Sequence, residues 1–222
     1  MDSEIKKAVC ISINRAGWPF IALFAVLTAG LWVFYPPLGF VGVVLTAWCA
    51  YFFRDPERIT PQKPGLVISP ADGVVLPLAE MPPPPELGIG DTARLRVSIF
   101  MNVFNVHVNR IPAHGVIGKI SYRPGRFFNA SLDKASEHNE RMSVSMKTDH
   151  GVEIAFVQIA GLVARRIKYD LAEGQQVRAG DRFGLIRFGS RVDIYLPTGT
   201  RPKVLARQIA VAGETVIADF GK

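Results

Sequence analysis

Two uncharged hydrophobic stretches near the start of the chain differ from everything that follows them. Trp18–Tyr35 and Leu38–Phe53 are each close to the length that crosses a bilayer as a helix. Pro36-Pro37 separates them, and proline does not continue a preceding helix. The pattern predicts a membrane-associated helical hairpin over residues 1–53. Both stretches are short for a full crossing, so the sequence leaves open whether the hairpin spans the bilayer or enters one leaflet.

The charges that flank these stretches predict which way the hairpin faces. Lys6, Lys7 and Arg15 precede the first stretch, and Arg54 and Arg58 follow the second. Because cytoplasmic flanks are enriched in Lys and Arg, both ends are expected in the cytoplasm. The rest of the chain is then expected on the cytoplasmic side of the cell membrane. A buried helical hairpin in a soluble core is the alternative.

Residues 54–222 show the alternation of a sheet with one buried face. Apolar residues occupy every second position at Leu95–Met101, Met142–Met146, Val152–Phe156 and Val192–Leu196, with glycine-containing turns between these segments. The pattern predicts a mainly β (α+β) domain after the hairpin, which is the expected catalytic domain. The segment Met81–Glu86, MPPPPE, is interpreted as a stiff, exposed polyproline spacer.

Two stretches narrow the expected β architecture further. Glu173–Ile186 and Val211–Phe220 each place a glycine turn, an apolar residue and a second turn or strand in succession. This resembles the barrel-sandwich hybrid of lipoyl and biotinyl domains. Those carriers present a lysine at a hairpin tip, and neither stretch contains one. The fold is therefore expected without the carrier function.

Composition and charge exclude several functional classes. The chain has 26 Lys and Arg against 19 Asp and Glu, a net charge of +7 that favours an anionic partner such as an acidic lipid surface. Two cysteines are too few for a disulfide scaffold or a cysteine-rich zinc site. The four histidines include no pair at helical spacing, and no metal site is indicated. Nucleic-acid binding is not favoured, because aromatic and basic residues do not interleave on a strand and no recognition helix is indicated.

Candidate chemistry lies near the C-terminus, in Gly184–Pro197, GLIRFGSRVDIYLP. Here Gly189-Ser190 stands between two strand-like runs, which by itself is typical of an ordinary turn or β-bulge. Three other segments change that interpretation. Ser69–Gly73, SPADG, places a carboxylate in a turn; Phe104–Pro112, FNVHVNRIP, places a histidine in a strand; and Phe52–Pro56, FFRDP, follows the hydrophobic hairpin.

Together with HNER at 138–141 and ARRI at 164–167, the order of these motifs resembles that of phosphatidylserine decarboxylase proenzymes, in their short bacterial and archaeal form. The resemblance implies cleavage between Gly189 and Ser190 into a β-subunit, 1–189, and an α-subunit, 190–222, with Ser190 becoming a pyruvoyl group. It also implies a carboxy-lyase that converts phosphatidylserine to phosphatidylethanolamine and CO2 through a Schiff base with that group. The expected assembly is a heterodimer of the two subunits, with any higher oligomer left open.

Residue roles follow from the same resemblance. His107 is the candidate general acid and base, with Asp72 orienting or charging it. Longer family members carry a second histidine in this strand, at a position that Arg110 occupies here. Either His107 serves both cleavage and decarboxylation, or another histidine joins the site, for which His138 is the first candidate.

Substrate-binding candidates are arginines that could hold a lipid phosphate or the substrate carboxylate. Arg165 and Arg166 are the candidates from the ARRI motif, and His138 is a further candidate for substrate binding. Arg54, Arg58 and Arg187 are further arginines of the same kind, and the sequence does not choose among them.

One alternative function uses the same predicted parts without catalysis. A membrane-anchored β-sandwich adaptor predicts no cleavage, a domain outside the cytoplasm and a coiled-coil hairpin. The chain contains no heptad pattern, which favours the enzyme.

Overall fold

The structure is a computed structural model that describes residues 11–125, 130, 139–161, 166–187 and 189–221. The chain divides into two compact units, Met1–Glu57 and Arg58–Lys222, and each is treated separately. The boundary lies four residues beyond the end of the predicted hairpin.

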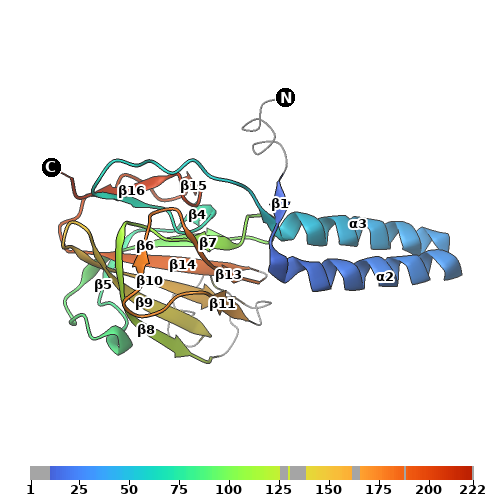
Figure 1. Cartoon of the computed structure of the whole chain (residues 1–222), viewed down its shortest axis with the longest axis horizontal. Coiled ribbons are helices and arrows are strands. Elements are labelled where there is room, and N and C mark those ends of the chain that lie inside the picture. Colours follow the sequence, from blue (N-terminus) through green and yellow to red (C-terminus); the bar gives the residue numbers. More distant parts are fainter. Residues whose placement is uncertain (1–10, 126–129, 131–138, 162–165, 188, 222) are drawn as a thin grey trace. The chain divides into compact units, whose positions relative to one another are not determined.

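The first unit is a helical hairpin (Figure 1). It consists of β1 (Ser12–Ile13), the 3-10 turn η1 (Arg15–Gly17), α2 (Trp18–Phe34), α3 (Pro36–Phe52) and β2 (Arg54–Asp55), with β1 and β2 paired antiparallel. The two prolines between the helices are the first residues of α3 rather than a separate turn. Tyr35 before them is extended, because a residue that precedes proline avoids the helical region.

Small residues let the two helices of the hairpin approach closely. A Cβ on Gly39 would lie 2.5 Å from the Trp32 ring, and one on Gly42 would lie 2.7 Å from Thr28 Oγ1. Thr28 and Thr46 share a 3.0 Å hydrogen bond between the helices. The helical segment Arg15–Phe34 is long and apolar enough to cross a membrane, whereas Pro36–Phe52 is a shorter apolar helix. The predicted apolar hairpin is confirmed.

The second unit is mostly antiparallel β-sheet, which confirms the mainly β prediction. Its largest sheet has nine strands, in the order β12-β8-β9-β10-β14-β6-β4-β15, with β5 also paired to β6. These strands are β4 (Gly73–Val75), β5 (Ala79–Met81), β6 (Arg94–Met101), β8 (Gly115–Arg123), β9 (Arg141–Thr148), β10 (Glu153–Ala160), β12 (Gln176–Val177), β14 (Ser190–Leu196) and β15 (Ile209–Ala210). The resemblance to lipoyl-type carrier domains stays a prediction.

Two smaller sheets complete this unit. One has the order β11-β13-β7 and contains β7 (Val108–Arg110), β11 (Ile167–Tyr169) and β13 (Arg182–Ile186). The other pairs β3 (Leu66–Ile68) with β16 (Val216–Asp219).

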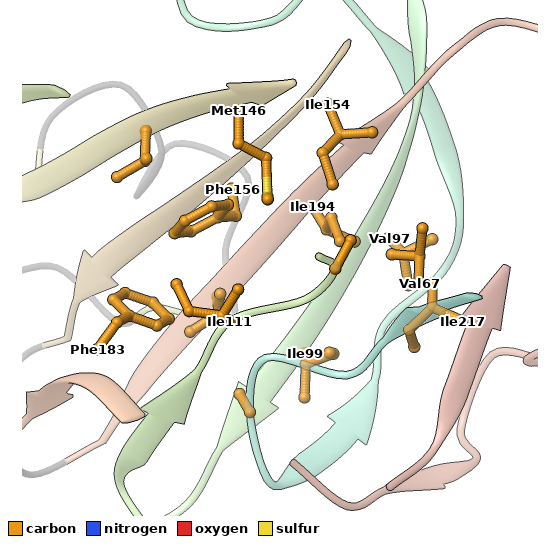
Figure 2. Close-up of a cluster of buried hydrophobic side chains, with 14 of the residues drawn as sticks. Val67, Val97, Ile99, Ile111, Met146, Ile154, Phe156, Phe183, Ile194 and Ile217 are labelled. Carbon is orange, nitrogen blue, oxygen red and sulfur yellow. The ribbon is translucent and has the colours of Figure 1, made fainter. Parts of the chain in front are cut away.

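The main core lies against one face of the nine-stranded sheet. Figure 2 shows Phe156, Phe183 and Ile194 within this core, where the rings of Phe156 and Phe183 meet edge to face at 5.0 Å between centroids. The side chains of β10 and β14 that face the core alternate with others that face away, as the period of two predicts. Both central strands are buried on both faces, which fixes the strand that begins at Ser190.

The polyproline segment is not an exposed spacer. Pro83 and Pro84 are buried, and the 3-10 turn η2 (Pro85–Leu87) places Leu87 in a second apolar cluster with β10 and Tyr195. Glu86 receives hydrogen bonds from Arg141 at 2.8 Å and from Ser143 at 2.9 Å. The exposure predicted for this segment was wrong at Pro83 and Pro84, because Leu87 packs on the second face of the sheet and Glu86 attaches the segment to β9.

Candidate active site

Gly189 and Ser190 lie where a loop enters the central strand β14. Ser190 pairs with Met101 of β6 on one side and with Ala160 of β10 on the other. Gly189 has a φ of +68°, a left-handed conformation that favours glycine. The Ser190 side chain has no exposed surface, and its hydroxyl donates to Met101 Sδ at 3.4 Å. The bond predicted to break therefore lies at the buried start of a strand, with a bent backbone before it.

His107 reaches this bond from the segment that precedes β7. Its Nε2 accepts a hydrogen bond from the Gly189 backbone N–H at 3.3 Å, and its Nδ1 lies 3.0 Å from the Asn105 carbonyl oxygen. A carbonyl oxygen only accepts, so Nδ1 must carry the proton and Nε2 must present its lone pair to Gly189. His107 is buried in the form that a general base requires. We call Gly189, Ser190 and His107 the cleavage centre.

Gly161, which sequence reasoning did not select, provides the space for the peptide carbonyl that precedes Ser190. A Cβ at position 161 would lie 2.1 Å from the Gly189 carbonyl oxygen and 2.9 Å from its carbon. Any side chain there would displace the carbonyl that Ser190 is predicted to attack. Nothing in the local sequence identifies Gly161, because the contact arises from the alignment of β10 beside β14.

Asp72 lies beside the histidine strand, with its carboxylate on other groups. Its Oδ2 contacts the Arg58 guanidinium at 2.8 Å, and its Oδ1 accepts from the Ala212 N–H at 2.7 Å. The turn that carries Asp72 is attached to β7, since the Pro70 carbonyl accepts from the Arg110 N–H at 2.9 Å. The structure thus gives the orienting contact of His107 to a backbone carbonyl, and the role of Asp72 stays a prediction.

Arg187 lies two residues before Gly189, and Arg166 lies opposite Arg187 in the continued register of β11 and β13. Ile167 of β11 pairs with Ile186 of β13, so the two arginines occupy the next positions on adjacent strands. Burial lowers the pKa of the Arg187 guanidinium, and the nearby charge of Arg166 lowers it further. Two like charges at neighbouring positions are stabilised by an anion between them. The other predicted binding residues, Arg165 and His138, lie outside the described residues.

A buried ion pair follows Ser190 in β14, and the sequence analysis did not predict it. Arg191 Nε lies 2.8 Å from Asp193 Oδ1, and neither side chain has exposed surface. Arg191 Nη1 also donates to the Ala130 carbonyl at 3.2 Å. The spacing of two along a strand gives both residues the same face and could have indicated the pair. The charges of Arg191 and Asp193 compensate each other within the buried part of β14.

Known proteins similar to this chain are phosphatidylserine decarboxylases. The family model described as phosphatidylserine decarboxylase matches residues 45–218. A phosphatidylserine decarboxylase proenzyme from Paramagnetospirillum magneticum is 62% identical over 217 residues, covering 98% of this chain and 90% of that protein. The proenzyme from Rickettsia felis is 59% identical over 210 residues, covering 95% and 91%. With a match over most of its length, the chain belongs to the phosphatidylserine decarboxylase family.

Proposed function

We infer that the chain is a phosphatidylserine decarboxylase proenzyme, which converts phosphatidylserine to phosphatidylethanolamine and CO2 with a pyruvoyl group formed from its own serine. Family membership supports this activity over the adaptor alternative. The observation that carries the residue assignment is the contact between His107 Nε2 and the Gly189 N–H, next to Ser190. We further propose that the chain is cut between Gly189 and Ser190 into residues 1–189 and 190–222.

The first step of this cleavage exchanges a peptide bond for an ester. The proton of the Ser190 hydroxyl leaves its contact with Met101 Sδ and passes to His107 Nε2, while the oxygen attacks the Gly189 carbonyl carbon. The bond between that carbon and the Ser190 nitrogen then breaks, and the nitrogen takes the proton from His107. The Gly161 gap accommodates the carbonyl oxygen as the carbon becomes tetrahedral.

The second step releases the two chains. A base removes the Ser190 Cα proton, and the bond between Cβ and the ester oxygen breaks, leaving Gly189 as a carboxylate and position 190 as dehydroalanine. Water then replaces the nitrogen of this residue, which leaves as ammonia. The residues present fit the resulting pyruvoyl group, since position 190 is buried beside a histidine. When formed, that group withdraws electrons from the bond to the substrate carboxylate.

A denaturing gel and an intact mass measurement test the cleavage. Wild type is expected to give a small fragment of residues 190–222 with a blocked N-terminus, and Ser190→Ala is expected to remain one full-length chain. Ser98→Ala is the matched control, because Ser98 is also a buried strand serine but faces away from Met101 along β6. A wild-type chain that decarboxylates the lipid while intact would refute the proposal.

Arg166 and Arg187 are proposed to hold the anionic part of the substrate near the cleavage centre. Their adjacent strand positions and the lowered pKa of Arg187 support an anion between them. Arg187→Gln is expected to raise KM for phosphatidylserine vesicles about tenfold or more while kcat changes less. Arg182→Gln is the control, because Arg182 is an exposed arginine of β13, the strand that ends one residue before Arg187. Equal KM values for Arg187→Gln and wild type would remove Arg187 from substrate binding.

The hairpin is proposed to hold the enzyme at the cell membrane with the second unit in the cytoplasm. Positive flanks on both sides of the apolar helices support this orientation. Leu38→Cys, in a chain whose Cys10 and Cys49 are replaced by serine, tests the depth. Labelling of this thiol by an impermeant reagent from outside the cell indicates a spanning hairpin, and labelling only after lysis indicates one that enters a single leaflet.

A further inference from the structure

A line of four buried side chains leads away from the cleavage centre into the core. The Ser190 hydroxyl donates to Met101 Sδ at 3.4 Å, and Asn109 Nδ2 approaches the same sulfur at 3.7 Å. Asn109 Oδ1 in turn accepts from Gln158 Nε2 at 2.7 Å. None of the four side chains has exposed surface. Met101 is therefore the shared acceptor between Ser190 and an amide pair.

The contacts of Asn109 fix which way its amide faces. Its Nδ2 also lies 3.4 Å from the Pro70 carbonyl oxygen, which can only accept a hydrogen bond. Gln158 supplies a donor to Oδ1 on the other side. Without the Gln158 donor, Asn109 Oδ1 would lose its 2.7 Å hydrogen bond, and the amide would be held only by the longer contacts of Nδ2 with the Pro70 carbonyl and Met101 Sδ. The donor of Gln158 is therefore the shortest contact that keeps Asn109 Nδ2 directed at the Met101 sulfur.

Gln158 is an energetically unfavourable residue at this buried position if its only role is packing. Its Oε1 is buried and has no hydrogen-bond partner among the residues that the structure describes. A methionine of similar shape would avoid this unpaired acceptor. A Cβ at Gly184 would lie 2.6 Å from the Lys168 carbonyl oxygen and 3.0 Å from Gln158 Nε2, so a side chain there would crowd this amide as well as the backbone. Packing alone therefore does not account for the unpaired acceptor of Gln158.

We propose that Asn109 and Gln158 are positioning residues for self-cleavage, which act through Met101 to hold the Ser190 hydroxyl in one orientation. The proposal rests on the cleavage at Ser190 inferred above. A thioether is a weak acceptor, so it selects one rotamer of the hydroxyl without holding it strongly when His107 takes the proton. Cleavage removes the hydroxyl, so the amide pair has no such role in decarboxylation.

Gln158→Met separates this role from packing. Cleavage is followed over time in full-length chain made by cell-free synthesis with lipid vesicles. If the hydroxyl is spread over three staggered rotamers of similar energy in place of one, cleavage is expected to slow by about threefold. The melting temperature is measured beside the cleavage rate, because the variant removes one unpaired acceptor, Gln158 Oε1, but leaves Asn109 Oδ1 without its donor. Decarboxylation per cut chain should match wild type. If Gln158→Met is cut at the wild-type rate under conditions in which wild type is cut, the proposal is overturned.

Met101→Leu tests whether the effect travels through the sulfur. It keeps the apolar volume and removes the acceptor, so it should slow cleavage on its own, and adding Gln158→Met should then slow it no further. Additive losses would overturn the route through Met101, even if one variant folds poorly. Hydroxylamine, which splits an ester but not a peptide, should fail to restore cleavage of Gln158→Met. Restoration would place the defect after serine attack and overturn the proposal.

Different results would contradict the proposed self-cleavage at Ser190 and the positioning role of Asn109 and Gln158. A wild-type chain that stays uncut would overturn the proposed function and this proposal together. A cut wild type with equally fast Gln158→Met and Met101→Leu variants would overturn this proposal alone. Ser98→Ala is again the control, because it removes a buried hydroxyl from the strand of Met101 on the opposite face.

Discussion

Adding one methyl group at Gly161 is expected to stop self-cleavage. The Cβ of Gly161→Ala would lie 2.1 Å from the Gly189 carbonyl oxygen and 2.9 Å from the carbonyl carbon, both of which are backbone atoms. Restoring ordinary contact requires a shift of about 1 Å, and a displacement of that size at a reacting group costs about a hundredfold in rate. The carbonyl that Ser190 attacks would move away from its hydroxyl.

The assay compares the time course of cleavage in Gly161→Ala and wild type, with the melting temperature of each. Overpacking by a methyl group is expected to cost about 1–3 kcal/mol of folding free energy, so the variant should still fold. Gly115→Ala is the matched control. Its Cβ would lie 2.2 Å from the Lys147 carbonyl oxygen, and its φ of +156° adds strain, but Gly115 pairs with Thr148 at the far end of β9 from Arg141.

If Gly115→Ala is destabilised as much as Gly161→Ala and yet cleaves normally, the loss of cleavage in Gly161→Ala is due to the displaced carbonyl. Wild-type cleavage in a folded Gly161→Ala chain would refute the reasoning, because the gap would then have no part in the reaction. Equal losses in both variants would refute it as well, since general destabilisation would explain them.

Three further perturbations test other contacts. His107→Ala is expected to abolish cleavage, measured on a gel, because it removes the only nitrogen that the structure places on Gly189 N–H among the described residues; normal cleavage would exclude His107 as the base. Asp72→Asn is expected to slow maturation, and an equal effect of Arg58→Gln would show that the turn, not the charge, matters. Burial acts to raise the pKa of Glu86, but hydrogen bonds and the charge of Arg141 outweigh it and lower the pKa. The stabilisation by Glu86 is therefore present above its unfolded pKa of about 4.3 and lost as the pH falls through the lower folded value. The melting-temperature difference between wild type and Glu86→Gln should shrink below about pH 4, and a constant difference would contradict this.

Much of the site could be predicted from the sequence, because the patterns and motifs that indicate it lie within short segments. Hydrophobic runs and period-two alternation reflect burial of neighbouring positions, so they predicted the hairpin, the strand that contains Met101 and residues 192–196 of β14. Ser190 was expected between two strands, whereas it is the first residue of β14. Motifs around Ser190, His107 and Asp72 lie within a few residues each and pointed to the family. Local chemistry did not show that α3 begins at Pro36, or that Pro83 and Pro84 are buried.

Local sequence patterns were enough to predict an apolar hairpin, a β-rich second unit, and the motifs that carry one histidine and one serine. The surroundings of these two residues depend on contacts between segments that lie far apart in the chain. His107 contacts Gly189 across 82 positions, and Ser190 contacts Met101 across 89. Strand register decides such contacts, and it depends on how whole faces of the sheet pack together. For the same reason Gly161 and Gln158 became visible as parts of the site only when β10 was placed beside β14.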